Sequence, residues 1–112
     1  MRLGAHLPIA DLGDGTPTAD DLSEYVRSAR SLGYSTVCAN DHLVWSRPWI
    51  DGPTALASIA AVAGDLTLAT SIALPVVRHP VTIAKLLTTL ACLTTGHVVA
   101  GLGPGSSRRD YA

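Results

Sequence analysis

The chain has 112 residues, of which 47% are hydrophobic and 15% charged, and its formal net charge at neutral pH is −1. This length allows one domain with a buried core, although the composition is apolar for a complete small domain and suits part of a larger one. The small net charge excludes the basic surface that binds nucleic acid or anionic lipid, and no apolar run reaches the roughly 18 residues of a membrane span.

Strand and helix patterns alternate along the first half of the chain. Residues 2–8 predict a short strand, and residues 35–40 predict a second one. Thr18 suits the N-cap of a helix between them, which Gly33 ends. Pro53 suits the first position of the next helix. The apolar positions expected to face inward recur at helical spacing, at Leu22, Tyr25, Val26, Ala29 and Leu32, then at Leu56, Ile59, Ala60 and Ala63, before Gly64 ends the second helix.

The second half repeats this alternation. Residues 66–72 and 97–102 predict two further strands, about 31 residues apart. Pro80 opens a third helix between them, and Gly96 lies past its end. Its predicted inward positions are Ile83, Leu86, Leu87, Leu90 and Leu93.

Such a repeat predicts an α/β fold with parallel strands and right-handed crossovers. It fits an open doubly wound sheet or the first four β/α units of a (β/α)8 TIM-type barrel. An open sheet buries its central strands on both faces and favours continuous apolar runs. Ser35, Thr36, Thr67 and Thr70 interrupt those runs. We therefore favour the barrel, with residues 1–112 as a single partial domain.

Two further features concern the cellular compartment. The N-terminal residues lack the basic and apolar segments of a signal peptide. Cys38 and Cys92 lie too far apart in the sequence for a metal or redox motif. We interpret both as small buried apolar residues of a cytoplasmic protein.

In either architecture, functional residues gather at the carboxyl ends of the strands. The second predicted strand ends at Asp41 and His42. An imidazole exchanges protons near neutral pH, and a neighbouring carboxylate tunes it. We therefore take these two residues as the candidate catalytic pair. The structural alternative is that Asp41 caps a turn and His42 packs under a loop.

The same rim carries aromatic and basic candidates. Trp45 and Trp49 follow His42 closely, which suits either a flat ring ligand or a loop that plugs the barrel mouth. Arg78 suits an anion at the next helix or, preferably, an ion pair with a rim carboxylate. Arg108 and Arg109 face either a phosphate or solvent.

A glycine-rich turn follows the fourth predicted strand. Gly101, Gly103 and Gly105 alternate with other residues, which is not the spacing of the dinucleotide-binding fingerprint. Glycines at these positions still allow a ligand to approach the backbone closely.

Taken in order, a set of residues resembles the luciferase-like flavin oxidoreductase family. The matching residues are 70–72, 77–81, 83–85, 89–90, 93, 96, 101–105 and 110–111. The resemblance runs along the whole chain and covers the N-terminal half of the family's barrel. It implies a (β/α)8 barrel that binds F420 or, alternatively, FMN at the carboxyl rim of its strands.

The resemblance also implies roles for individual residues. Asp41, His42 and Trp45 are similar to an Asp-His pair and a following Trp that lie beside the deazaflavin in the F420-dependent branch. Residues matching Ser71 and Ile72 form a strand bulge, often with a non-prolyl cis peptide, that supports the ring. The implied cofactor-binding residues are Asp41, His42, Trp45, Thr70, Ser71, Ile72, Gly103, Gly105 and Ser106.

We therefore expect an oxidoreductase that transfers hydride between F420 or FMN and a small organic substrate, as a homo-oligomer. His42 would donate a proton or act electrostatically on the ring, with Asp41 orienting it. Ser106 departs from the pattern, because sugar-phosphate dehydrogenases of the family place a catalytic acid there. The alternatives are a non-catalytic flavin-binding module, or an inactive half-barrel that self-associates through its unpaired edge strands.

Overall fold

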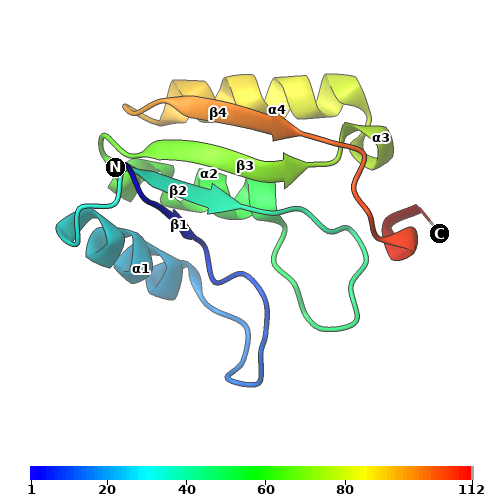
Figure 1. The fold of residues 1–112 in the computed structure, drawn as a ribbon, viewed down its shortest axis with the longest axis horizontal. Coiled ribbons are helices and arrows are strands. Elements are labelled where there is room, and N and C mark those ends of the chain that lie inside the picture. The colour runs from blue at the N-terminus through cyan, green and yellow to red at the C-terminus, as the bar shows by residue number, and fades with distance from the viewer. Residues whose placement is uncertain (112) are drawn as a thin grey trace.

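The computed structural model describes residues 1–111, and four parallel strands form its single sheet (Figure 1). The strands follow one another in chain order across the sheet, each paired in parallel with the next. Their bounds are β1 Gly4–His6, β2 Thr36–Ala39, β3 Thr67–Ala73 and β4 Val98–Leu102. The four predicted strands and their parallel pairing are confirmed, each strand within a few residues of its predicted bounds.

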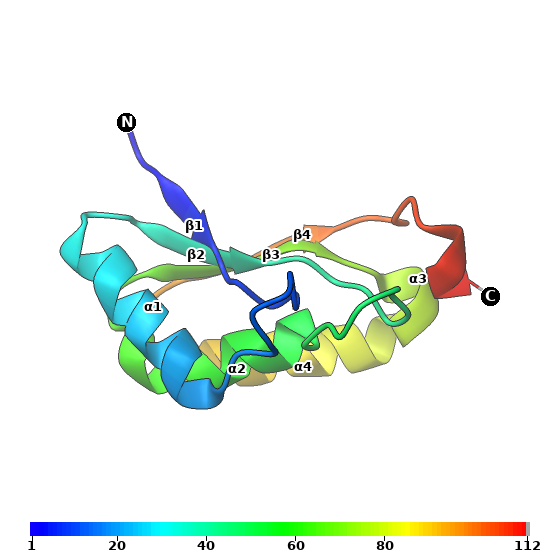
Figure 2. The same cartoon turned by 90° about the horizontal axis from the view of Figure 1, so that it is seen from below.

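The helices cover one face of this sheet. Figure 2 shows α1, α2 and α4 side by side beneath the strands, and no helix lies on the opposite face within residues 1–111. Their bounds are α1 Ala19–Ser31, α2 Gly52–Ala63 and α4 Pro80–Leu93. A doubly wound sheet carries helices on both faces, whereas a barrel carries them only outside. The strand order and the single helical layer therefore confirm the predicted β/α barrel arrangement.

Two short helical elements lie beyond the strand ends. Figure 1 shows α3 (Pro75–Arg78) directly after β3, and the 3-10 helix η1 (Arg108–Tyr111) at the same end of the sheet. Neither was predicted. None of the helices within the described residues is both long and apolar enough to cross a bilayer.

The helix starts follow local capping chemistry. The Asp21 backbone N–H donates to the Thr18 hydroxyl, and the Asp21 carboxylate accepts from the Thr18 backbone N–H at 2.8 Å, which completes a capping box. The predicted N-cap is thus confirmed. For α2 the N-cap is Asp51, whose carboxylate accepts from the Thr54 backbone N–H at 3.0 Å. This helix therefore begins at Gly52, one residue before the predicted start at Pro53.

The core lies between the sheet and the helices. The predicted stripe of α2 is buried throughout, as are Ile83 and Leu90 of α4. Leu32 and Leu93, predicted to be inward, are instead 75% and 56% exposed, because Leu32 follows the end of α1 and Leu93 is the last residue of α4.

The prediction that both cysteines are buried was wrong. Cys38 is half-buried, because it alternates along β2 with the buried Val37 and Ala39 and so faces the side of the sheet without helices. Cys92 is exposed, because it lies two positions after the buried Leu90 and hence on the opposite side of α4.

Candidate functional site

A hollow of about 390 Å³ lies at the carboxyl ends of β2, β3 and β4. Three chain segments line it, one from the end of each strand. The lining residues are Asn40, Asp41, His42, Ser71, Ile72, Pro104, Gly105 and Ser106. This volume lies in the range of small-molecule sites. Six of the nine residues predicted to bind the cofactor therefore meet at one place.

The other three predicted residues surround the hollow rather than line it. Thr70 is buried, and its hydroxyl donates to the Gly101 carbonyl oxygen at 2.8 Å, which ties β3 to β4. Gly103 lies against Ile72, and a Cβ added there would meet the Ile72 Cδ1 at 2.2 Å. Trp45 packs against the ring of His42.

A bulge in β3 turns two side chains toward the hollow. Thr70 pairs with Ala100, but Ala73 pairs with Leu102, so β3 carries one more residue than β4 between these pairs. The extra residue lies in the Ser71–Ile72 segment, whose peptide bond is cis, as the resemblance implied. Both side chains are exposed, and Ile72 presents 38% of its surface.

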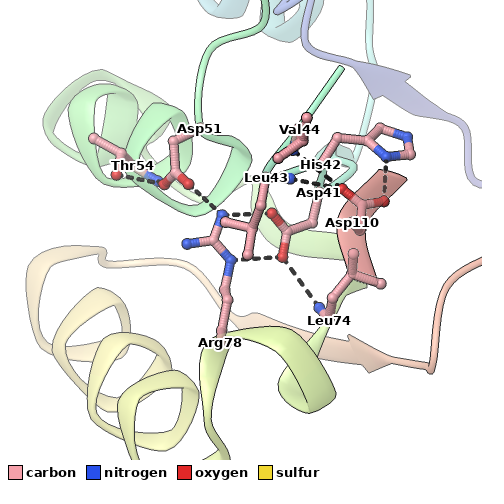
Figure 3. A network of polar contacts seen from close by, with 9 residues as sticks. All are labelled: Asp41, His42, Leu43, Val44, Asp51, Thr54, Leu74, Arg78 and Asp110. Atoms are coloured by element: carbon pink, nitrogen blue, oxygen red, sulfur yellow. Dashed lines mark hydrogen bonds and ion pairs between the residues drawn. The ribbon is translucent and has the colours of Figure 1, made fainter. Parts of the chain in front are cut away.

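Asp41 belongs to an ion cluster with Arg78 and Asp51, which we call the arginine cluster (Figure 3). Arg78 donates from Nε to Asp41 Oδ2 at 2.7 Å and from Nη2 to Asp41 Oδ1 at 2.5 Å, and Nη2 also contacts Asp51. The backbone N–H of Leu74 donates to the same Asp41 carboxylate at 3.1 Å. The hydrogen bond to Asp41 raises the pKa of Arg78, so its charge is permanent. The predicted ion pair of Arg78 with a rim carboxylate is thus confirmed.

His42 belongs to a second cluster, although it follows Asp41 directly in the chain. Its Nδ1 lies 3.0 Å from Oδ2 of Asp110, and the other Asp110 oxygen accepts from the backbone N–H of Leu43 and of Val44 at 2.9 and 3.2 Å (Figure 3). The carboxylate that holds His42 is therefore that of Asp110 and not, as predicted, that of Asp41. We call His42, Asp110 and Trp45 the imidazole cluster.

Asp110 is a buried residue, and its carboxyl group is ionised there. Burial raises its pKa, but the hydrogen bonds from His42, Val44 and Leu43 outweigh that effect and leave the pKa below its usual range. Asp110 is therefore a buried anion held by three donors.

Two tryptophans complete the surroundings of His42. The Trp45 ring centroid lies 4.2 Å from that of His42 at an interplanar angle of 31°, and Trp49 meets His42 edge-on at 5.0 Å. The loop after β1 fixes Trp49, since Ala10 forms an antiparallel bridge with it. Arg109 lies with its guanidinium carbon 5.8 Å from the Trp45 ring centroid, which is a cation–π contact.

The lining of the hollow fits a flat ring with polar edges. Ser71 and Ser106 line the hollow and offer hydroxyl groups to the polar edge of such a ring. Ile72 and Trp45, 38% and 39% exposed, offer apolar surface beside it.

Several site residues escaped prediction from the sequence. Asn40 and Pro104 line the hollow, and Asp110 holds His42. Outside the hollow, the contact of Asp51 with Arg78 in the arginine cluster was not predicted either. Asn40 could have been found from the sequence, because it directly precedes Asp41 and His42 at the end of the second predicted strand. Asp110 lies 68 residues from His42, and no spacing rule links them.

Comparison with known proteins identifies relatives along the whole chain. The family model described as "Luciferase-like monooxygenase" matches residues 1–112. An "F420-dependent glucose-6-phosphate dehydrogenase" of Beutenbergia cavernae is 35% identical over 95 residues, covering 80% of this chain and 28% of the relative. An "F420-dependent hydroxymycolic acid dehydrogenase" of Mycobacterium tuberculosis is 31% identical over 101 residues, covering 83% and 27%.

Solved structures share the fold. The monooxygenase RslO1 from Streptomyces bottropensis superposes with a TM-score of 0.79 at 26% identity, covering 99% of this chain and 35% of that one. The oxygenating constituent of 3,6-diketocamphane monooxygenase from Pseudomonas putida superposes with a TM-score of 0.72 at 23% identity, covering 96% and 30%.

The chain belongs to the luciferase-like monooxygenase family. It spans 28% and 27% of the length of the two dehydrogenases above.

Proposed function

We propose that the protein is an oxidoreductase that moves a hydride between coenzyme F420 and a small organic substrate, with FMN as the alternative cofactor. One observation carries the proposal: the hollow at the strand ends brings the imidazole of His42 together with an exposed apolar side chain, Ile72, and the hydroxyl-bearing Ser71 and Ser106. The names of the F420-dependent relatives support this choice of cofactor.

The residues present would hold such a cofactor in distinct ways. Ile72 and Trp45 offer apolar contact to the ring, and Asn40, Ser71 and Ser106 offer polar contact to its edge. Gly105 turns the chain at the mouth of the hollow with a φ of 76°, a conformation that favours glycine. When bound, F420 would supply a two-electron acceptor and donor for hydride.

His42 would handle the accompanying proton. Its Nδ1 is engaged by Asp110, so Nε2 is the ring nitrogen left for the substrate. An alcohol that loses a hydride from carbon must also lose its hydroxyl proton, and Nε2 would take that proton up and return it in the reverse direction. Asp41 would shape the wall of the hollow and leave proton transfer to His42.

Ser106 limits the kinds of proton transfer that the site can catalyse. The resemblance places a catalytic acid at this position in sugar-phosphate dehydrogenases, whereas a serine hydroxyl does not ionise near neutral pH. We therefore propose a reaction with one titratable side chain, His42, in place of an acid–base pair.

The test combines binding with turnover. The protein is titrated with F420 and with FMN, following cofactor fluorescence, and is then assayed with the bound cofactor against small alcohols. We expect F420 to bind more tightly than FMN. We also expect His42→Ala to lose most of the turnover, on the order of 10²-fold, with an unchanged circular dichroism spectrum.

Unchanged turnover in His42→Ala would refute the proton role. Binding without turnover for any alcohol would instead identify a flavin-binding module without catalysis. If neither cofactor binds, the proposal as a whole is wrong.

A further inference from the structure

The hydrogen bonds around Asp110 constrain more than the position of His42. Both carboxylate oxygens are committed: Oδ1 accepts from the backbone N–H groups of Leu43 and Val44, and Oδ2 faces His42 Nδ1 at 3.0 Å. The side chain of Asp110 is 1% exposed, so water contributes little to this arrangement. Counting the donors and acceptors around Asp110 therefore determines which atom donates in each hydrogen bond.

An ionised carboxylate only accepts hydrogen bonds. His42 Nδ1 must then be the donor, and it carries the proton when the imidazole is neutral. The second ring nitrogen, Nε2, is left without a proton and makes no hydrogen bond within the described part of the chain.

We infer that Asp110 is a positioning residue that selects the Nδ1–H tautomer of His42, so that Nε2 meets the substrate as a proton acceptor. This inference rests on the proposed function for its catalytic consequence, but the tautomer is a property of the protein alone. A proton taken up at Nε2 yields an imidazolium that remains bound to the Asp110 carboxylate. Asp110 thus orients the ring and balances its charge, as carboxylates do in hydrolytic triads.

The same geometry determines what an amide would do at position 110. In Asp110→Asn the two backbone N–H groups of Leu43 and Val44 still need an acceptor, so the amide oxygen must take the Oδ1 place. The amide NH₂ then faces His42 Nδ1 and donates to it. Nδ1 is forced to accept, and the proton moves to Nε2. A single oxygen-to-nitrogen exchange therefore inverts the tautomer while the backbone contacts persist.

The experiment reads the tautomer directly. The protein is labelled with ¹⁵N-histidine, and long-range ¹H–¹⁵N correlations of the His42 ring are recorded without cofactor, at a pH where the ring is neutral. We expect the Nδ1–H pattern in the wild type, the Nε2–H pattern in Asp110→Asn and a mixture in Asp110→Ala. The matched control, Asp51→Asn, makes the same chemical change in the arginine cluster and should keep the wild-type pattern.

Turnover with bound cofactor gives the second readout. We expect Asp110→Asn to lower kcat on the order of 10²-fold with little change in KM, because the proton acceptor is lost while the hollow keeps its shape. Asp51→Asn should turn over like the wild type. A loss of the same size in both variants would identify a general structural effect and overturn the inference.

Further outcomes decide the matter. An Nε2–H pattern in the wild type overturns the inference, and so does a wild-type pattern in Asp110→Asn. If Asp110→Asn does not fold, the wild-type spectrum alone decides. A tautomer that follows residue 110 in a protein that binds neither F420 nor FMN supports the inference and refutes the proposed function.

Discussion

Two carboxylates that lie at the same rim serve different ends in this molecule. Asp41, in the arginine cluster, is paired with the guanidinium of Arg78, and Asp110, in the imidazole cluster, is paired with the imidazole of His42 (Figure 3). A guanidinium stays charged at all physiological pH values, whereas imidazole is the side chain that general acid–base catalysis uses most often. Asp41 therefore has a structural role, whereas the adjacent His42 belongs to the candidate reaction centre.

The arginine cluster joins three elements that the chain separates. Asp41 follows β2, Arg78 ends α3 and Asp51 caps α2. Since α3 follows the bulged strand β3, this ion cluster also fixes the end of the segment that carries Ile72. The comparison therefore predicts losses of stability at one cluster and losses of turnover at the other.

The largest loss of stability is expected for Arg78→Met. This variant leaves the Asp41 carboxylate, whose side chain is 1% exposed, without its cation. Removing one partner of a buried ion pair lowers the free energy of unfolding by about 3–5 kcal/mol. Urea unfolding followed by circular dichroism measures this loss.

The control for that experiment is the double variant Arg78→Met with Asp41→Leu. It removes both charges and should recover much of the lost stability, because no unpaired charge stays buried. If Arg78→Met alone loses less than about 1 kcal/mol, Asp41 is as hydrated as a surface carboxylate, and the contrast between the clusters fails.

Alanine substitutions at two nearby glycines, Gly101 and Gly103, should have effects of intermediate size, one on the stability of the sheet and the other on the hollow. An alanine Cβ at Gly101 would lie 2.2 Å from the backbone oxygen of Thr70, whereas one at Gly103 would lie 2.2 Å from the Cδ1 atom of Ile72. Backbone cannot yield easily, so Gly101→Ala should lose about 1–3 kcal/mol of stability. A side-chain end can rotate, so Gly103→Ala should fold nearly as well but displace Ile72.

The two glycine variants serve as matched controls for each other. Gly103→Ala should weaken F420 binding more than it lowers stability, and thermal unfolding beside a fluorescence titration measures both. Equal losses of stability in the two variants would show that Ile72 cannot move, and that the hollow is as rigid as the strands.

Much of the fold could be predicted from the sequence because periodicity is a local property. The stripe at Leu56, Ile59 and Ala63 needs only helical spacing, and glycine and proline mark the element ends. The elements α3 and η1, of four residues each, are too short to show a period. Because η1 was not predicted, the position of Asp110 was not predicted either, whereas the ion pair of Arg78 with a rim carboxylate could be predicted without α3.

Six of the nine predicted cofactor-binding residues line the hollow, but the partner of His42 was predicted wrongly. Sequence adjacency favoured Asp41 as the partner of His42, yet successive side chains leaving a strand point to opposite sides. Asp41 accordingly turns to Arg78 and His42 to Asp110. Long-range pairs of this kind depend on how the strand ends converge, which only the folded chain determines.

The smallest effect expected is the pH dependence of Asp51. Burial raises the pKa of this carboxyl, but the hydrogen bonds from Thr54 and Arg78 lower it by more than burial raises it. The net shift of the pKa is therefore downward. A lowered folded-state pKa stabilises the protein at pH values above the ordinary value of about 3.9, and this contribution disappears as the pH falls through that value toward the folded-state one. Asp51→Ala should therefore lose about 1 kcal/mol of stability at pH 7, as for other N-cap deletions, and the difference in stability from the wild type should narrow below about pH 4.

Asp51→Asn keeps a capping oxygen for Thr54 and should lose less stability. Its turnover should match the wild type, because Asp51 lies outside the hollow. Urea unfolding at a series of pH values measures the difference. A gap that stays constant down to pH 3 would show that the Asp51 charge does not stabilise the fold, and that Asp41 alone holds Arg78 in the arginine cluster.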